Sequence, residues 1–391
     1  MADSNLLQNN SSQSRLLVIG YGCAGSRVVA DLAKNKLLKV TVLHALDYME
    51  MPFLMTYVAA TGAEEHEQVL HPVLHEENVE YINATATSLG PDSCTTSNGQ
   101  IIHFDICVVT TGQKYATFYP DPNTEFKLED RKAFISNFQR KIKAAFTIVI
   151  AGGGPVGVEL AADIKLRNKR KRVILVHPQK FVLDKMSAPF PSIATDTLKS
   201  QGVEVVMDRV VSHEGNVAIL QSGGKINYDL FIPTNPSGGC NGSFLPVECL
   251  DSKGYITVNH FLQVEGLPKV FAMGDCSNRN SKKGEWAIRD QLPILLKNVV
   301  ALAQEKPLTP HVLGKFRASM LKGPIFVAIG HHHPDAFGVG PDFPQPLRCI
   351  LWLCCCFTSP CHTPSSKELG KLKTKMDMEM TPKAGKGIID R

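Results

Sequence analysis

TIVIAGGGPVGVELAA, from Thr147 to Ala162, contains a complete dinucleotide-binding turn. The apolar residues at 148–151 are typical of a buried parallel strand. Gly152, Gly154 and Gly157 then form the pattern G-x-G-x-x-G, which gives a tight turn, access of a pyrophosphate to the backbone and close packing of helix on strand. The residues at 158–164 continue as a helix whose N-terminus would face the phosphates.

The same plan occurs a second time near the N-terminus. LLVIGYGCAG places Gly20, Gly22 and Gly25 after an apolar strand and before a helical stretch at 26–33. One such pattern is a weak signal, because glycine-rich turns that bind nothing share its spacing. Two in one chain favour two bound dinucleotides.

The composition is that of an ordinary globular protein. The chain has 391 residues, 43% hydrophobic and 20% charged, which predicts two or three domains. The polar residues 1–14 lack the apolar core of a signal peptide and are expected to be a disordered lead. No apolar run reaches the roughly 18 residues of a membrane-spanning helix. The eleven cysteines lack the spacing of a secreted disulfide framework, so we expect a reducing compartment.

The second strand of each predicted βαβ unit ends in a histidine. An acidic residue at this position usually binds the adenosine ribose. The first unit has His44, with Asp47 as the nearest acid that could substitute, and the second has His177. Because His177 and the nearby Lys180 would not repel a 2′-phosphate, we expect NADPH to be tolerated and even preferred.

Two further turns follow apolar strands. Thr111-Gly112 follows the strand at 106–109 and would bring a hydroxyl and bare backbone near a cofactor. Gly274-Asp275 places a carboxylate at the C-terminal edge of a sheet, where ligands of open α/β folds bind. A Pro- and Asp-rich break at 120–123 and a second break at 235–242 separate these segments and suggest domain crossings.

Two charged or ligand-rich clusters have ordinary explanations. Lysines and arginines crowd the residues at 165–172, where cations complement the end of a helix dipole. A nucleic-acid or anionic-membrane patch is the less favoured alternative. The adjacent histidines at 331–333 do not share a face, so we expect an exposed loop and predict no metal site.

With both glycine turns, Thr111-Gly112 and Gly274-Asp275 in this order, the chain resembles the FAD-dependent pyridine nucleotide oxidoreductases. Within them it is most similar to the group of ferroptosis suppressor proteins and apoptosis-inducing-factor homologues, relatives of the type II NADH dehydrogenases. The resemblance covers roughly residues 15–376. It is strongest in LLVIGYGCAG, IVIAGGGPVGVELAADI, ILVH and DSKGYITVNHFLQVEGLPKVFAMGDCSN.

The resemblance implies an α/β fold with two Rossmann-like domains, the NAD(P)H domain being inserted into the FAD domain, and a small C-terminal α+β subdomain. The expected parts are the lead at 1–14, the FAD domain at 15–121 and 245–306, the NAD(P)H domain at 122–244 and the C-terminal subdomain at 307–391.

The resemblance also assigns the site residues. FAD is expected on the first glycine turn and NAD(P)H on the second glycine turn. Glu159 is the candidate catalytic residue, close to where nicotinamide meets flavin. An acid in the first turn of a helix is also explained by the helix dipole alone. Thr234-Asn235-Pro236 replaces the second Thr-Gly turn of the family. The FAD residues are Gly20, Gly22, Gly25, His44, Asp47, Thr111, Gly112 and Asp275, and the NAD(P)H residues are Gly152, Gly154, Gly157 and His177.

The implied activity is that of an NAD(P)H:quinone oxidoreductase, in which hydride passes from nicotinamide to flavin and electrons then pass to a quinone. Residues 47–67 contain no cysteine pair, so we expect no dithiol relay, and Cys276 is expected to be a buried thiol. The alternatives are a flavoprotein effector that binds nucleic acid, and a reductase with a protein or ascorbate-radical acceptor.

A quinone with an isoprenoid tail resides in a membrane, so we expect the protein to reach a membrane surface. CILWLCCCF at 349–357 is too short to span a bilayer but contains a Cys triplet that could be acylated, and a lysine-rich tail follows it. A core strand is the ordinary explanation of this segment. The expected location is cytoplasmic, peripheral on a membrane or lipid droplet, with mitochondrial association as an alternative.

Overall fold

The computed structural model describes residues 13–50, 55–61, 66, 69–73, 75–118, 126–186, 190–234, 236–280 and 283–312. The chain divides into two compact units, Met1–Asp342 and Phe343–Arg391, and every described residue belongs to the first. Apart from residues 13–14 and 307–312, the predicted lead and C-terminal subdomain lie outside the described residues. The same holds for the histidines at 331–333 and for the segment at 349–357.

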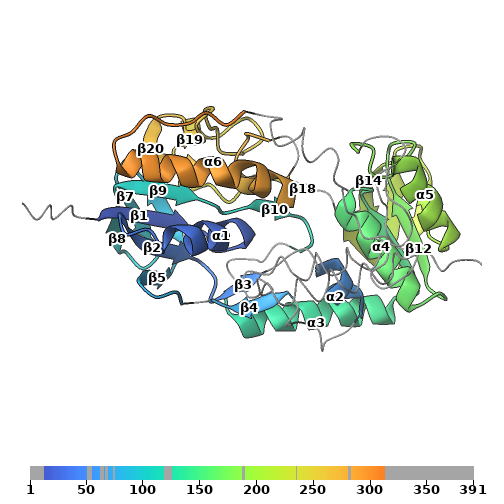
Figure 1. The fold of residues 1–391 in the computed structure, drawn as a ribbon. Helices are drawn as coiled ribbons and strands as arrows, with labels where there is room; N and C mark the ends of the chain where they lie inside the picture. The colour runs from blue at the N-terminus through green and yellow to red at the C-terminus, as the bar shows by residue number, and fades with distance from the viewer. Residues whose placement is uncertain are drawn as a thin grey trace, which may run out of the picture. The chain divides into compact units, whose positions relative to one another are not determined.

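The first fold is built on a six-stranded sheet (Figure 1). Its strands, in spatial order, are β19 (Gln263–Val264), β20 (Leu267–Ala272), β9 (Ile106–Val109), β1 (Ser14–Ile19), β2 (Leu38–His44) and β5 (Val79–Asn83). All neighbours pair in parallel except β19 with β20. This is the topology expected of a Rossmann-like fold, and it brings the carboxyl ends of β1 and β9 to one edge.

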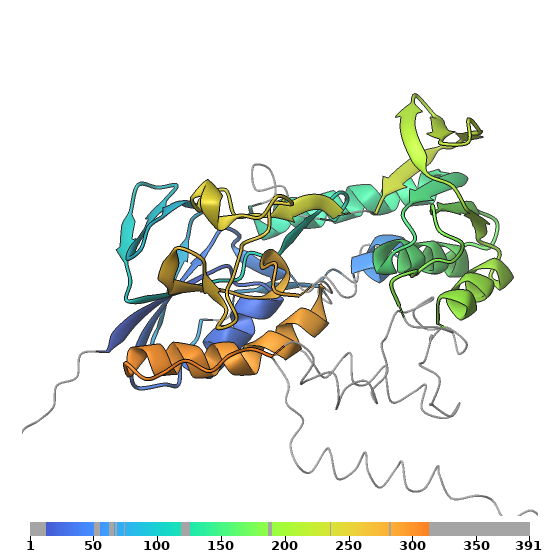
Figure 2. The ribbon, with the colours of Figure 1, turned by 90° about the horizontal axis from the view of Figure 1, so that it is seen from above.

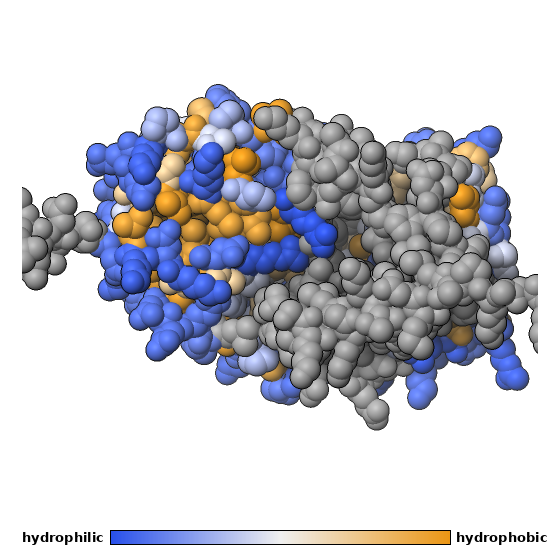
Figure 3. Space-filling model, in the orientation of Figure 1, coloured by the Kyte–Doolittle hydropathy of each residue, from blue (hydrophilic) through white to orange (hydrophobic). Residues whose placement is uncertain are grey.

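Helices cover one face of this sheet and a small antiparallel sheet covers the other (Figure 2). Leu16 and Val18 of β1 pack toward α1 (Cys23–Leu32) and α6 (Glu285–Ala303), whereas Leu17 and Ile19 belong to the opposite core cluster. The small sheet consists of β6 (Ala86–Leu89), β7 (Ser93–Thr96) and β8 (Ile101–His103). Apolar surface remains over α6 (Figure 3), where Leu292 and Leu296 are only partly buried.

The second fold has a four-stranded parallel sheet. Its strands, in spatial order, are β13 (Glu204–Val206), β12 (Arg172–Val176), β11 (Thr147–Ala151) and β17 (Leu230–Pro233). Its helices are α3 (Leu128–Ala144), α4 (Pro155–Arg167) and α5 (Phe190–Ser200), and an antiparallel sheet is formed by β14 (Val210–Glu214), β15 (Val217–Leu220) and β16 (Lys225–Asn227). Apolar side chains of α4, such as Val158 and Leu160, are fully buried in its core.

The two chain crossings between the folds pair with each other. β10 (Gln113–Tyr115) follows β9, β18 (Pro236–Cys240) follows β17, and the two strands are antiparallel. The second fold is therefore inserted into the first, as expected, while the predicted domain boundaries stay predictions. The remaining elements are β3 (Tyr48–Glu50), α2 (Met55–Thr61), β4 (Leu70–Pro72) and the short 3-10 helices η3 (Val247–Cys249) and η4 (Gly274–Cys276).

Candidate functional site

The first glycine turn has the geometry that its pattern predicts. Gly20 has φ +97°, a left-handed conformation that favours glycine. A Cβ on Gly25 would lie 2.0 Å from the Gly20 carbonyl oxygen, whereas a Cβ on Gly22 would meet nothing within 4 Å. The turn is therefore packed tightly against α1 and open in front of Gly22, at the N-terminus of α1, which fits a pyrophosphate.

Thr110, directly after β9, holds this turn in place. Its Oγ1 donates to the carbonyl oxygens of Gly20 at 2.9 Å and Ile19 at 3.2 Å. The next residue, Thr111, has a buried Oγ1 without a hydrogen-bond partner among the described residues. Gly112 follows with φ +69° and open space at its Cβ position. A buried hydroxyl that lacks a partner beside open backbone fits a bound FAD, which would complete its hydrogen bonding.

His44 is engaged by the backbone rather than free to bind a ribose. Its Nδ1 accepts the N–H of Tyr21 at 3.1 Å, and its Nε2 lies 2.9 Å from the Tyr48 carbonyl oxygen, to which it donates. Burial lowers the pKa of His44 to about 4, so the ring is neutral. Asp47 accepts the N–H of Leu128 at 2.7 Å, at the start of α3. The structure thus shows both residues fixing local structure, and their predicted contact with the ribose remains a prediction.

Asp275 lies in η4, beside the first turn of α1. A Cβ on the preceding Gly274 would be 3.4 Å from Cβ of Ala24, and the Gly274 N–H donates to Oε1 of the buried Gln291 at 2.7 Å. Asp275 accepts the N–H of Gly284, which precedes α6. The predicted carboxylate is therefore at the expected edge of the sheet, near the turn, and is held there by the start of α6.

The second glycine turn repeats the first almost atom for atom. Gly152 has φ +127°, a Cβ on Gly157 would lie 1.9 Å from the Gly152 carbonyl oxygen, and a Cβ on Gly154 would meet nothing within 4 Å. Thr234, after β17, donates to the carbonyl oxygens of Gly152 at 3.0 Å and Ala151 at 3.2 Å. Although the Thr-Gly sequence is lost here, the threonine performs the same task as Thr110.

His177 occupies the position that His44 has in the first fold. Its Nδ1 accepts the N–H of Gly153, the middle residue of the turn, at 3.2 Å. A Cβ on Gly153 would lie 2.6 Å from Cγ of His177, so the ring packs directly on bare backbone. The histidine therefore requires a glycine at this turn position, whereas the first turn has Tyr21 there.

Glu159 lies near the beginning of α4 and contacts the segment that follows β3. Oγ1 of Thr56, in α2, donates to Oε2 of Glu159 at 3.4 Å. At the other end of α4, Arg167 donates to the Tyr57 hydroxyl at 3.0 Å and its guanidinium stacks on the Tyr57 ring. The candidate catalytic carboxylate is thus in contact with α2, which packs with Ala59 in the same core cluster as α4.

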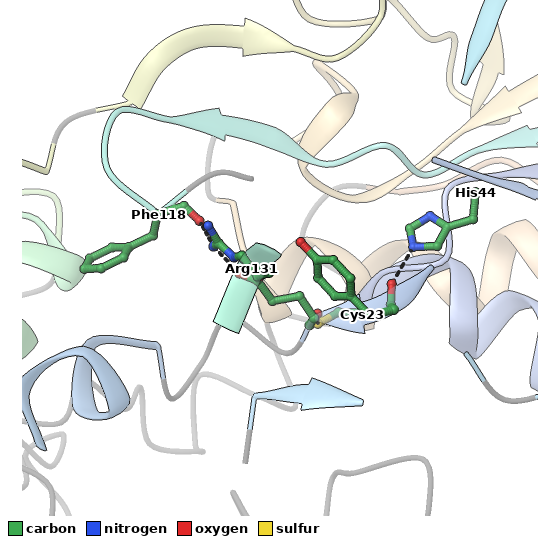
Figure 4. A network of polar contacts seen from close by, with 6 residues as sticks. Cys23, His44, Phe118 and Arg131 are labelled. Atoms are coloured by element: carbon green, nitrogen blue, oxygen red, sulfur yellow. Dashed lines mark hydrogen bonds and ion pairs between the residues drawn. The ribbon is translucent and has the colours of Figure 1, made fainter. Parts of the chain in front are cut away.

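A buried ion pair between Arg131 and Glu50 anchors α3 near the first glycine turn (Figure 4). Arg131, with a fully buried side chain, donates to both carboxylate oxygens of Glu50 at 2.8 and 2.9 Å and to the Phe118 carbonyl at 2.6 Å. Cys23, the first residue of α1, lies with its Sγ 3.8 Å from the Glu50 carbonyl oxygen. The network ties α1, β3 and α3 together, and no sequence pattern singles out Arg131.

The cysteines of the described residues are free thiols. Cys23 is partly exposed, and the other five are buried: Cys94, Cys107, Cys240, Cys249 and Cys276. Burial raises the pKa of Cys276 to about 12, and its Sγ donates to the Met273 carbonyl at 3.1 Å. This is the environment of a structural thiol, as expected for Cys276.

The basic cluster after α4 is largely consumed by local contacts. The buried Lys171 donates to the carbonyls of Lys143 and Ala145 at the C-terminal end of α3, and Lys165 donates to the Lys171 carbonyl at 2.7 Å. Arg172 pairs with Glu204 at 2.8 Å. These contacts favour the explanation by helix ends over a nucleic-acid patch.

The described residues contain neither a metal-binding cluster nor a membrane-spanning helix. No group of three histidine, cysteine or acidic side chains is arranged there to hold a metal ion. None of the helices in the same part of the chain has the length and apolar character needed to cross a bilayer.

Comparison with known proteins gives the family. The model of the pyridine nucleotide-disulphide oxidoreductases matches residues 5–303. The oxidoreductase ptaL of Pestalotiopsis fici is 28% identical over 321 residues, which are 76% of this chain and 85% of that protein. The human ferroptosis suppressor protein 1 is 25% identical over 281 residues, 65% and 71% of the two chains, in agreement with the predicted resemblance.

Two more similarities extend this result. The external alternative NAD(P)H-ubiquinone oxidoreductase B2 of Arabidopsis thaliana is 22% identical over 331 residues, 71% of this chain and 56% of that protein. The solved structure of the sulfide:quinone oxidoreductase from Aquifex aeolicus shares the fold, with a TM-score of 0.62 at 16% identity over 75% and 78% of the two chains. The predicted fold and the predicted cofactors, FAD and NAD(P)H, are thereby confirmed. The chain belongs to the pyridine nucleotide-disulphide oxidoreductase family and is an FAD-dependent NAD(P)H oxidoreductase.

Proposed function

We propose that this chain is an NAD(P)H:quinone oxidoreductase, with FAD on the first glycine turn and NAD(P)H on the second. The observation that carries the proposal is the pair of matching glycine turns, each with open space at its second glycine, Gly22 or Gly154, directly before a helix. Nicotinamide and flavin must meet for hydride transfer, and the family resemblance assigns Glu159 to the neighbourhood of that meeting point. FAD bound on the first glycine turn would supply the redox chemistry, accepting a hydride and releasing two electrons and a proton.

The protein's own groups bind and orient the two nucleotides. The open space at Gly22 and Gly154 admits the pyrophosphates to the starts of α1 and α4. Thr110 and Thr234 hold the turns rigid behind them. This arrangement supports the cofactor assignment, because in each turn the first and third glycines are tightly packed while the second has open space where a pyrophosphate would lie.

A thiol relay does not fit the described cysteines. The family takes its description from disulfide chemistry, but residues 47–67 contain no cysteine and the five buried thiols lie in the protein core. Electrons would therefore leave the reduced flavin directly for a small acceptor. A quinone is favoured because the similar plant protein is an NAD(P)H-ubiquinone oxidoreductase.

The test is an absorbance spectrum of the purified protein under anaerobic conditions. We expect flavin bands that bleach on addition of NADH or NADPH and recover when a short-chain ubiquinone is added. Protein that stays colourless after incubation with FAD would contradict the cofactor assignment. Recovery with ferricyanide but with no quinone would instead favour a protein or ascorbate-radical acceptor.

Membrane contact belongs to the same proposal, because a quinone with an isoprenoid tail is dissolved in the bilayer. The residues at 349–357 and the lysines after them are the proposed contact, on sequence alone. The full chain should sediment with vesicles containing anionic lipid, and a chain without residues 349–391 should stay in the supernatant. Sedimentation of the shortened chain would show that this segment is not the contact.

The effector alternative makes the opposite prediction. A flavoprotein that acts by binding nucleic acid would bind DNA with an affinity that falls steeply with salt and would turn over little NAD(P)H. The engagement of Lys165, Lys171 and Arg172 by local carbonyls and by Glu204 weighs against it.

A further inference from the structure

We propose that Asp184 recognises the adenosine ribose of the nicotinamide dinucleotide and makes NADH the preferred donor. The inference rests on the proposed use of β11, α4 and β12 to bind NAD(P)H. In such a unit the residue at the end of the second strand lies beside the ribose, where an acidic side chain accepts a hydrogen bond from the 2′-hydroxyl. Here that residue is His177, which follows β12, and the acid comes from a loop further along the chain.

The ring of His177 lies between the glycine turn and the side chain of Asp184. Its Nδ1 accepts the Gly153 N–H at 3.2 Å, which leaves Nε2 as the ring nitrogen on the side of Asp184. Oδ1 of Asp184 lies 3.2 Å from that Nε2. The imidazole thus lies between the glycine turn and the carboxylate. The negative charge of Asp184 is therefore near the end of β12, which has no acid of its own.

The loop that carries Asp184 is attached to the turn at several points. The Val182 N–H donates to Oγ1 of the buried Thr195 at 3.1 Å, and the Leu183 N–H donates to the Gly153 carbonyl at 2.8 Å. Leu183 is buried and has φ +54°, a conformation that costs a non-glycine residue about 1 kcal/mol or more. A bulky residue keeps such a conformation only where its surroundings impose it, and the result is a fixed direction for Asp184.

The first fold lacks this arrangement, which shows that it is not a general consequence of a histidine at the strand end. Nε2 of His44 donates to the Tyr48 carbonyl at 2.9 Å instead of facing a carboxylate. Of the two strand-end histidines, only His177 thus lies beside a carboxylate, at the end where the dinucleotide donor would bind.

A carboxylate at this place discriminates between the two donors. The Asp184 side chain is 36% exposed, so it can face a ligand while it contacts His177. It can accept a hydrogen bond from the free 2′-hydroxyl of NADH and repels the 2′-phosphate of NADPH, which carries up to two negative charges. Nζ of Lys180, which the sequence suggested as a partner for that phosphate, lies 5.1 Å over the ring of Phe181. The proposal therefore reverses the preference expected from the sequence.

The test compares the binding of NAD⁺ and NADP⁺, which differ only in the 2′-phosphate, to the FAD-loaded protein by calorimetry. We expect at least tenfold tighter binding of NAD⁺, and Asp184→Asn should reduce the ratio of the two dissociation constants by about tenfold. Asp184→Glu should retain most of the preference. Asp196→Asn, which removes an exposed carboxylate from α5, is the matched control and should leave the ratio unchanged.

Two results would overturn the proposal: tighter binding of NADP⁺ to the unaltered protein, or an unchanged ratio in Asp184→Asn. Neither result depends on the acceptor, because no electrons are transferred in the measurement. Failure of the quinone assay would thus leave this inference standing, and failure of this inference would leave the quinone assay standing. His177→Asn, which keeps an acceptor for the Gly153 N–H, should lower the ratio partway if the ring positions Asp184.

Discussion

Thr110 and Thr234 hold the two glycine turns in the same way, although only one of them precedes a Thr-Gly pair. Each hydroxyl donates to the carbonyl of the first glycine in its turn, at 2.9 Å to Gly20 and 3.0 Å to Gly152. Each also contacts the Cβ position of the third glycine, at 2.7 Å for Gly25 and 2.8 Å for Gly157. The threonine, the first glycine and the third glycine therefore form one packed unit in both folds.

Replacing one threonine at a time with valine should weaken one nucleotide site and leave the other unchanged. Valine keeps the shape but loses the donor, at a cost of about 1 kcal/mol, or roughly fivefold in affinity. We expect Thr110→Val to lower the flavin content of the purified protein. Thr234→Val should keep its flavin and raise the KM for NAD(P)H. Equal loss of flavin in both variants would contradict the assignment of one nucleotide to each turn.

Alanine at the second and third glycines should have different effects. In Gly25→Ala the new Cβ would overlap the Gly20 carbonyl, so we expect a loss of roughly 1–3 kcal/mol of unfolding free energy even without FAD. In Gly22→Ala the Cβ enters open space, so the free energy of unfolding without FAD should be unchanged while FAD affinity falls. Denaturant unfolding of the flavin-free proteins and titration with FAD measure the two effects. A Gly22→Ala protein with full flavin content would show that this space is not used by the cofactor.

His44 should make the protein less stable in mild acid. Its pKa of about 4 in the folded chain lies below the roughly 6.5 of an unfolded histidine, so between these values the unfolded chain binds a proton that the folded chain does not. The free energy of unfolding therefore falls as the pH is lowered from about 6.5 to about 4. At about 1.4 kcal/mol for each pH unit the loss approaches roughly 3 kcal/mol.

The matched variant is His44→Asn, which keeps an acceptor near the Tyr21 N–H and does not titrate. Its unfolding free energy, measured in urea across the same pH range, should fall less steeply than that of the unaltered protein by this amount. Parallel pH curves for the two proteins would show that His44 is protonated without cost in the folded state.

Local patterns were sufficient to predict the parts of the fold whose signal lies in consecutive residues. The sequence predicts strands at 106–109 and 172–176 with the observed ends, because short apolar runs bounded by turns have few alternatives. It predicts both glycine turns for the same reason. α1 starts at Cys23, three residues before the expected start. Gly25, which packs closely on Gly20, already belongs to the first turn of this helix.

The contacts that were not predicted join residues far apart in the chain. Thr234 is 82 residues from Gly152, and Arg131 is 81 residues from Glu50, so no window of sequence contains both partners. α2 and α5 were not predicted either. Asp184 lies close to His177 in the sequence, but its position beside the ring depends on a loop that Thr195 of α5 holds, and no local pattern predicts this. The two glycine turns can be located from the sequence, whereas the residues packed around them are determined by tertiary contacts.

The buried pair of Arg131 and Glu50 should be costly to break on one side only. Their side chains are 0% and 10% exposed, so removing one partner leaves an uncompensated charge in the core. Arg131→Met alone is expected to lower the unfolding free energy by about 3–5 kcal/mol, and the double change with Glu50→Met should recover part of the loss. Arg15→Met is the control, since its pair with Asp105 is half exposed and its loss should change the unfolding free energy far less. A loss in the double variant equal to the sum of the single losses would show that the two charges do not depend on each other.

Glu159→Gln should reduce turnover without disturbing the fold. The carboxamide oxygen can still accept the hydrogen bond from Thr56, so the melting temperature and the flavin content should stay unchanged while the charge is lost. We expect kcat with NADH and ferricyanide to fall at least tenfold if the carboxylate acts beside the nicotinamide. Thr56→Val is the matched variant, because it removes the contact between α2 and α4 but leaves the charge of Glu159 in place. If Thr56→Val lowers kcat as much as Glu159→Gln does, the role of Glu159 is to hold the helices together, and its assignment as the catalytic residue is wrong.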